Sequence, residues 1–87
     1  MNTHSNSTDD RVVTVVQSLF KQRSISHEIH SEDNLIEVGL TSLDTVKLVL
    51  LVEDEFDLTM PLSDITPANF RSIAAISRLV ARLLGVG

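Results

Sequence analysis

The sequence is poor in several residue types that often carry function. It has no cysteine, tryptophan or tyrosine, and only three phenylalanines among its 87 residues. The lack of cysteine excludes disulfides, thiolate zinc sites and cysteine nucleophiles. No apolar run reaches the ~18 residues that a membrane-spanning helix needs, and the N-terminus lacks the basic and apolar regions of a secretory signal. We therefore expect a soluble, cytoplasmic protein that does not enter a membrane.

The charge of the chain is unevenly distributed. Residues 28–64 contain ten acidic residues and one basic residue, Lys47, which gives this segment a net charge of −9, whereas the remainder carries +4. Such a field repels nucleic acid and attracts partners with basic patches. A DNA-binding helix-turn-helix is therefore disfavoured. The alternative interpretation is a solvated acidic face that only aids solubility.

The apolar residues, 43% of the chain, are spaced as in helices. The spacing predicts an all-α fold, a small four-helix bundle of three longer helices and one short helix, with a long loop between the first two. We expect residues 1–8 to be a disordered tail and residues 9–87 to be a single domain. The first helix spans about 9–22, with Thr8 as its cap. Its buried stripe comprises Val12, Val16, Leu19 and Phe20.

Two further helices are predicted near the C-terminus. A brief one starts at Thr66, where a cap residue precedes proline, and ends near Phe70. Ser72 then caps a last helix that runs to about Leu84 and stops at Gly85. Its inward residues are Ile73, Ile76, Val80, Leu83 and Leu84. The long connection over 24–41 has no helical period, and its own apolar side chains are expected to pin it. These are Leu35, Ile36, Val38 and Leu40.

The helix predicted over 42–56 carries the most informative pattern. Thr41 is its expected N-cap, and Asp44 can complete a capping box. The stripe facing the core comprises Leu48, Val52 and Phe56, with Thr45 and Val49 beside it. A second apolar stripe, formed by Leu43, Val46 and Leu50, lies on another side and has the composition of a docking surface. The alternative is a central helix that is buried on several sides.

Ser42 opens this helix, at a position where free N–H groups and the helix dipole attract a phosphate. An exposed hydroxyl beside an apolar strip indicates an attachment point rather than a catalytic centre. A catalytic set of Ser42 with histidine and aspartate is disfavoured, because so small a bundle has little room for a substrate pocket. We predict no metal site, since nothing completes a pair of His27 and His30. The acids over 53–57 lack the pattern of a calcium loop.

The segment from Asp33 to Ile76 resembles the acyl carrier and peptidyl carrier protein family. The pattern of that family is an acid and an apolar residue, a glycine, Asp-Ser-Leu, an amphipathic helix that ends in Glu-Glu-x-Phe, and a loop with Ile-Pro. This sequence has Asp33 and Leu35, Gly39-Leu40-Thr41-Ser42-Leu43, Asp44-Thr45-Val46, Leu48-Val49, Glu53-Asp54-Glu55-Phe56 and Met60-Pro61. The motifs cover about half of the chain, and the predicted helices extend the match to nearly all of it.

The resemblance implies a carrier rather than an enzyme. Ser42 would bear a covalent 4′-phosphopantetheine arm, transferred from coenzyme A by a phosphopantetheinyl transferase. The arm would hold an acyl or aminoacyl group as a thioester. A monomeric carrier would present this cargo to an acyl- or aminoacyl-loading ligase and to a downstream acyl transferase or synthase. The residues expected to meet partners are Thr41, Leu43, Asp44, Val46, Lys47, Leu50, Glu53 and Asp54.

Two positions depart from the family pattern. Thr41 stands where aspartate is usual, and Lys47 stands where carriers of fatty-acid synthesis commonly have an acid. These departures disfavour general fatty-acid synthesis and favour a specialised, stand-alone acyl or aminoacyl carrier. An alternative function is a helical adaptor that binds basic partner proteins without any covalent group.

Overall fold

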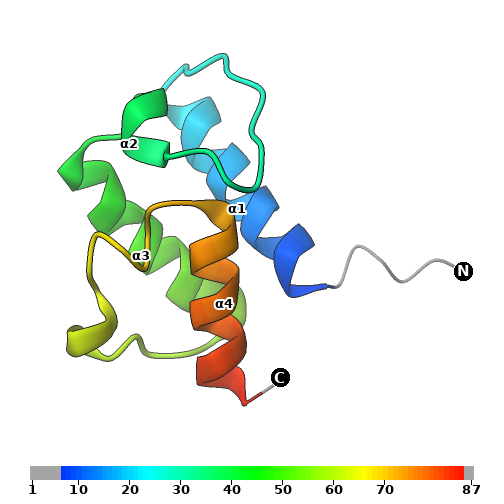
Figure 1. Ribbon diagram of the computed structural model, residues 1–87, viewed down its shortest axis with the longest axis vertical. Coiled ribbons are helices and arrows are strands. Elements are labelled where there is room, and N and C mark those ends of the chain that lie inside the picture. The colour runs from blue at the N-terminus through cyan, green and yellow to red at the C-terminus, as the bar shows by residue number, and fades with distance from the viewer. Residues whose placement is uncertain (1–6, 86–87) are drawn as a thin grey trace, which may run out of the picture.

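Four α-helices and one short 3-10 helix follow one another along residues 7–85, the part of the chain that the computed structural model describes (Figure 1). The elements are α1 (Thr8–Gln22), α2 (Leu35–Val38), α3 (Ser42–Phe56), η2 (Leu62–Asp64) and α4 (Ile73–Leu84). No strand occurs within this described range. The all-α fold of three longer helices and one short helix is therefore confirmed.

Helix α1 is central to the packing, because it contacts both α3 and α4. Its predicted stripe is confirmed, with Val12, Val16 and Leu19 fully buried. At the other edge, Arg11 joins α1 to the end of α3. Its Nε donates to Glu55 Oε2 at 2.8 Å, and its guanidinium lies 4.4 Å from the centre of the Phe56 ring. Both a polar and an aromatic contact therefore fix the angle between these two helices.

The connection between α1 and α3 contains a short helix that the sequence analysis missed. Helix α2 is capped by Asn34, whose side chain accepts from the N–H groups of Ile36 and Glu37. It ends at Gly39, whose φ of 139° is poorly suited to any residue with a Cβ. Leu35 is buried as expected, but Ile36 is 52% exposed and does not pin the loop.

The short helix predicted between Thr66 and Phe70 is wrong. This segment makes a single turn, in which the Thr66 hydroxyl accepts from Asn69 N–H at 3.2 Å and Phe70 N–H donates to the Pro67 carbonyl at 3.3 Å. Ser72 is already extended, with φ of −150°. Too few residues therefore remain for the i to i−4 bonds of an α-helix. The short helix of the bundle is α2 instead.

The ends of the outer helices agree with the sequence analysis in part. Ser72 caps α4 and Gly85 ends it, as expected, but Leu84 is 42% exposed rather than inward. The cap of α1 is Ser7, and Thr8 is the first helical residue, so the cap prediction was wrong by one position. Residues 7 and 8 of the predicted tail therefore belong to the fold, and residues 1–6 lie outside the described residues.

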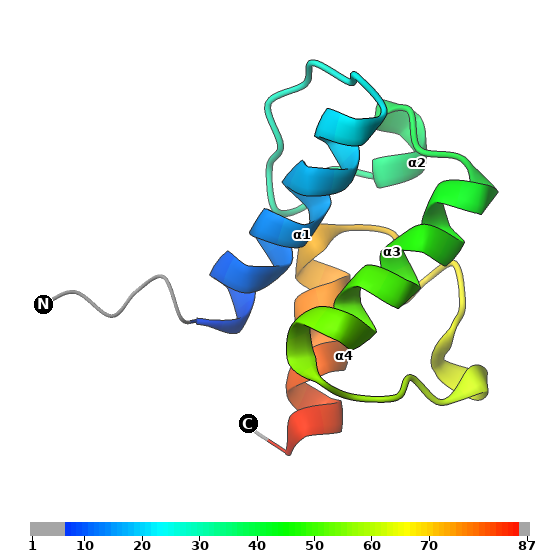
Figure 2. The same cartoon turned by 180° about the vertical axis from the view of Figure 1, so that it is seen from behind.

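The start of α3 lies beside α2, and α3 crosses in front of α4 when the molecule is seen from behind (Figure 2). Helix α3 therefore has one side toward the bundle and another toward solvent. No helix within residues 7–85 combines the length and apolar character needed to span a membrane.

Candidate functional site

Ser42 is exposed at the first position of α3. The preceding residue, Thr41, is extended and caps the helix, as predicted. Its hydroxyl accepts from Asp44 N–H at 3.2 Å, and Asp44 Oδ2 accepts from Thr41 N–H at 2.8 Å. This reciprocal capping box fixes the first turn of a fifteen-residue helix. The Ser42 hydroxyl therefore lies where the helix dipole favours a negative charge.

The carboxylate of Asp44 is enclosed by the protein. The residue is only 3% exposed, and Oδ2 also accepts from the Thr41 hydroxyl at 3.0 Å and pairs with Arg23. Donation from Thr41 N–H is the main cause that lowers the pKa of this carboxyl, with Arg23 contributing in the same direction. The expectation that Asp44 meets partners is corrected, because its oxygen is used inside the fold.

An apolar strip, formed by Leu43, Val46 and Leu50, runs along the solvent side of α3. These side chains are 76%, 55% and 59% exposed, so the domain leaves the second stripe uncovered, as the sequence analysis predicted. The core stripe behaves oppositely, since Leu48 is 1% exposed and Val52 is fully buried. The helix is therefore not buried on several sides.

The charged residues expected on α3 differ in their freedom to contact a partner. Lys47 and Asp54 are exposed. Glu53 is half-buried, and its carboxylate accepts from the backbone N–H of Met60 at 2.7 Å. Lys47 and Asp54 are therefore the charges that the structure leaves beside the apolar strip, whereas Glu53 also holds the loop after α3.

A groove of about 690 Å³ opens beside Ser42, between α2, the start of α3 and the segment 65–71. Ile36, Thr45 and Phe70 line it, and Glu37 and Arg71 are also part of its wall. The sequence analysis did not predict this groove, and it expected Ile36 to pin the loop rather than to line a groove. The sequence signals for α2, the helix that carries Ile36, are weak. They are a cap residue, Asn34, before a run of four residues and a glycine, Gly39, after it.

The two loop histidines serve a local contact. His27 Nε2 lies 3.2 Å from Asp33 Oδ2, which also accepts from His30 N–H at 3.0 Å. This backbone donation is the main cause that lowers the pKa of Asp33. Residues 7–85 contain no group of three metal-ligating side chains. The described residues that line the groove beside Ser42 include no histidine.

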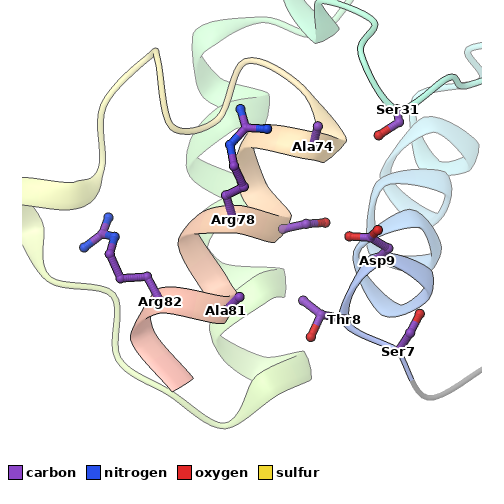
Figure 3. Close-up of a pocket in the computed structure, with 9 residues that line it drawn as sticks. Ser7, Thr8, Asp9, Ser31, Ala74, Arg78, Ala81 and Arg82 are labelled. Carbon is purple, nitrogen blue, oxygen red and sulfur yellow. The ribbon is translucent and has the colours of Figure 1, made fainter. Parts of the chain in front are cut away.

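A second hollow lies between the start of α1 and α4 (Figure 3). Thr8 and Asp9 approach α4 where its side chains are small, whereas Arg78 and Arg82 extend from α4 away from α1. This hollow shares no lining residue with the groove beside Ser42. It is therefore separate from the candidate site.

The structure has the features expected of a carrier domain, namely a small helical bundle, an exposed serine at a capped helix start and an uncovered apolar strip on the same helix. The chain belongs to the phosphopantetheine attachment site family, whose family model matches residues 10–86. This membership confirms the resemblance drawn from the sequence. It means that the chain is a carrier with a covalently attached phosphopantetheine group.

Curated relatives agree with this assignment. The chain is 46% identical over 78 residues to aminoacyl carrier protein 2 of Bradyrhizobium diazoefficiens, with 90% of this chain and 88% of the relative covered. It is 41% identical over 71 residues to aminoacyl carrier protein 1 of the same organism, with 82% and 79% covered.

Solved structures extend the agreement to the fold. One is the structure of Bradyrhizobium japonicum glycine:[carrier protein] ligase complexed with glycylated carrier protein. A chain of that structure matches this chain with a TM-score of 0.76 at 39% identity, and the match covers 83% of this chain and 96% of the matched chain. Another is the structure of the Bradyrhizobium japonicum ligase complexed with its cognate carrier protein and an analogue of glycyl adenylate. Its matched chain gives a TM-score of 0.78 at 39% identity, and the match covers 86% of this chain and 96% of the matched chain.

The residues present suit the group that the family carries. An exposed hydroxyl is available for a phosphodiester, and the start of α3 favours the negative charge of that phosphodiester. The adjacent groove offers both apolar and polar walls. Ser42 is exposed in the part of the chain that the structure describes, so a modifying enzyme can approach it there.

Proposed function

We propose that Ser42 is the residue that bears the phosphopantetheine arm, and that the chain carries an aminoacyl group between partner enzymes. The observation that carries the proposal is the exposure of Ser42 at the capped start of α3. When bound, the arm supplies a terminal thiol that holds the cargo as a thioester. The protein itself supplies position, charge and a docking face, and we propose that it catalyses no step.

The comparisons favour an amino acid as cargo. Two relatives are named aminoacyl carrier proteins, and two similar structures are complexes with a glycine:[carrier protein] ligase. Thr41 and Lys47, which depart from the pattern of fatty-acid carriers, support the same interpretation. We therefore propose that an aminoacyl-loading ligase charges this carrier with a small amino acid, and that a downstream transferase or synthase receives the cargo.

We propose that partners dock on the solvent side of α3. The apolar strip supplies the contact area, Lys47 and Asp54 supply charges beside it, and Ile36 extends it across the groove from α2. Thr41 lies next to the attachment residue and Glu53 near the end of the strip. Acidic residues speed the encounter with basic partners, and the apolar groups fix the register. Affinity should be modest, because a carrier has to release each partner.

Four further properties stay predictions. Residues 9–87, of which 86 and 87 lie outside the described residues, are proposed to act as a single carrier domain, together with Ser7 and Thr8 at the start of α1. The chain works as a monomer, and the cytoplasm is its expected location. The phosphopantetheinyl transferase is the partner that acts on it before any loading enzyme.

Intact-mass analysis tests the attachment residue. The purified chain, Ser42→Ala and Ser63→Ala are each incubated with coenzyme A, Mg²⁺ and a broadly tolerant phosphopantetheinyl transferase. Ser63 is a second exposed serine and serves as the matched control. We expect one added arm on the wild type and on Ser63→Ala, and none on Ser42→Ala with unchanged circular dichroism. A wild-type chain that gains no mass would contradict the proposal and favour the non-covalent adaptor.

A further inference from the structure

The end of α1 is joined to the start of α3 by one ion pair. Arg23 is the residue that closes α1, and its N–H donates to the Leu19 carbonyl at 3.0 Å. Its guanidinium reaches across to the carboxylate of Asp44, which is 21 positions later in the sequence. Asp44 lies two residues after Ser42 in the first turn of α3.

Burial makes this ion pair consequential for the first turn. The side chain of Asp44 is 4% exposed, whereas that of Arg23 is 36% exposed. A buried carboxylate needs hydrogen bonds and a compensating charge. Thr41 supplies two hydrogen bonds from within the capping box, and Arg23 supplies the charge from a different helix. The first turn of α3 is therefore tied to the end of α1.

We propose that Arg23 is a positioning residue for the modification of Ser42. By pairing with Asp44, it holds the first turn of α3 against α1 and fixes the direction of the Ser42 hydroxyl. This inference rests on Ser42 being the attachment residue. It assigns to Arg23 no contact with the transferase or with the arm, only an action through Asp44.

Loss of Arg23 should loosen the turn without unfolding the protein. Asp44 would keep its two hydrogen bonds from Thr41 and its favourable place near the positive end of α3. The docking strip lies partly on later turns and would stay in place. The Ser42 hydroxyl would then be less well oriented, whereas the docking face would be intact. We therefore expect a lower kcat with little change in KM, because orientation of the reacting group is lost while binding is kept.

The test measures transferase kinetics with Arg23→Gln as substrate. Lys21→Gln is the matched control, since it removes the same charge from the same end of α1 and its side chain is exposed. For Arg23→Gln we expect kcat to fall about tenfold and KM to change less than about twofold, and for Lys21→Gln we expect neither to change. Amide hydrogen exchange over residues 42–45 should be faster in Arg23→Gln than in the control.

A double-mutant cycle separates action through Asp44 from a direct contact. In an Asp44→Asn background, Arg23→Gln should cause no further loss of kcat, because the partner through which it acts is already neutral. Additive losses would overturn the proposal and indicate that Arg23 meets the transferase itself. Arg23→Lys keeps the charge and should recover part of the kcat that Arg23→Gln loses. If Asp44→Asn does not fold, amide exchange over residues 42–45 replaces the cycle, because a direct contact between Arg23 and the transferase would leave that exchange the same in Arg23→Gln and in the control.

The outcomes for Arg23 and Ser42 are distinguishable. If the proposed function fails, the wild-type chain is not modified at Ser42. If the inference on Arg23 fails, the wild type is modified normally, and Arg23→Gln shows the kcat and exchange rates of the Lys21→Gln control.

Discussion

Two leucines of α3 provide the sharpest test of how this helix is used. Leu48 is 1% exposed and Leu50 is 59% exposed. Both become alanine in the same helix, so the change in helix propensity is nearly equal and cancels in the comparison. Leu48→Ala removes a buried side chain and leaves a cavity, which costs about 2–5 kcal/mol of unfolding free energy. Leu50→Ala removes exposed atoms and should stay within about 0.5 kcal/mol of the wild type.

Urea and thermal unfolding followed by circular dichroism measure the difference. For a domain of this size, a loss of about 3 kcal/mol lowers Tm by roughly 12–24 °C. The urea midpoint of Leu48→Ala should fall without a change in the m-value, which would mean that stability alone is altered. Leu50→Ala should instead weaken binding to the transferase or the loading ligase, measured at a temperature where all variants are folded.

One result would refute the reasoning directly. If Leu50→Ala loses as much stability as Leu48→Ala, then the solvent side of α3 is part of the core and is not a docking strip. If Leu50→Ala is stable and binds every partner as the wild type does, the strip is exposed but unused, and the proposed docking face is wrong.

The remaining predictions concern pH and backbone geometry. The pKa of Asp44 and that of Asp33 are lowered in the folded state. Both carboxylates therefore stabilise the fold above about pH 4, which is near the pKa of an aspartate in the unfolded chain. That contribution is lost as the pH falls through the pKa of the folded state. Urea unfolding at pH values from 6 to 3 should show this loss of unfolding free energy. Asp44→Asn should make the unfolding free energy depend less steeply on pH, and an unchanged dependence would contradict the lowered pKa of Asp44. Gly39→Ala should cost about 1–3 kcal/mol through its φ of 139°, since the added Cβ makes only an ordinary 3.5 Å contact with Ile25. Gly85→Ala, with φ of 76° and open space around it, should cost less, and equal urea midpoints for the two would contradict this.

The features that the sequence predicts well are local. The capping box of Thr41 and Asp44 spans four residues, and the end of α4 at Gly85 depends on one backbone conformation. The apolar stripes of α1 and α3 repeat over several turns, so their period is readable without any tertiary contact. The position of Ser42 at a helix start follows from the same local pattern.

The features that escaped prediction depend on contacts between distant segments. Helix α2 has only four residues, too few for a period, and it is held by the burial of Leu35 and by donation from Leu35 N–H to the Arg71 carbonyl at 2.8 Å. The pairing of Arg23 with Asp44 joins positions that no local motif relates. Asp44 was therefore expected at the surface, although its carboxylate is enclosed. The groove beside Ser42 has the same origin, since three separate segments form it.

The rotation of α3 about its axis links the core to Ser42, the proposed attachment residue. With a turn of about 100° per residue, Ser42, Val46 and Leu50 fall within an arc of about 80°, and the centre of the buried stripe lies roughly 120° away. Burial of Leu48 and Val52 fixes this rotation, because any other would place those side chains in water. The exposure of Ser42 is thus a consequence of the same packing that stabilises the bundle. A partner that covers Val46 and Leu50 therefore meets the Ser42 hydroxyl on the same face, and needs no rearrangement of the carrier to reach it.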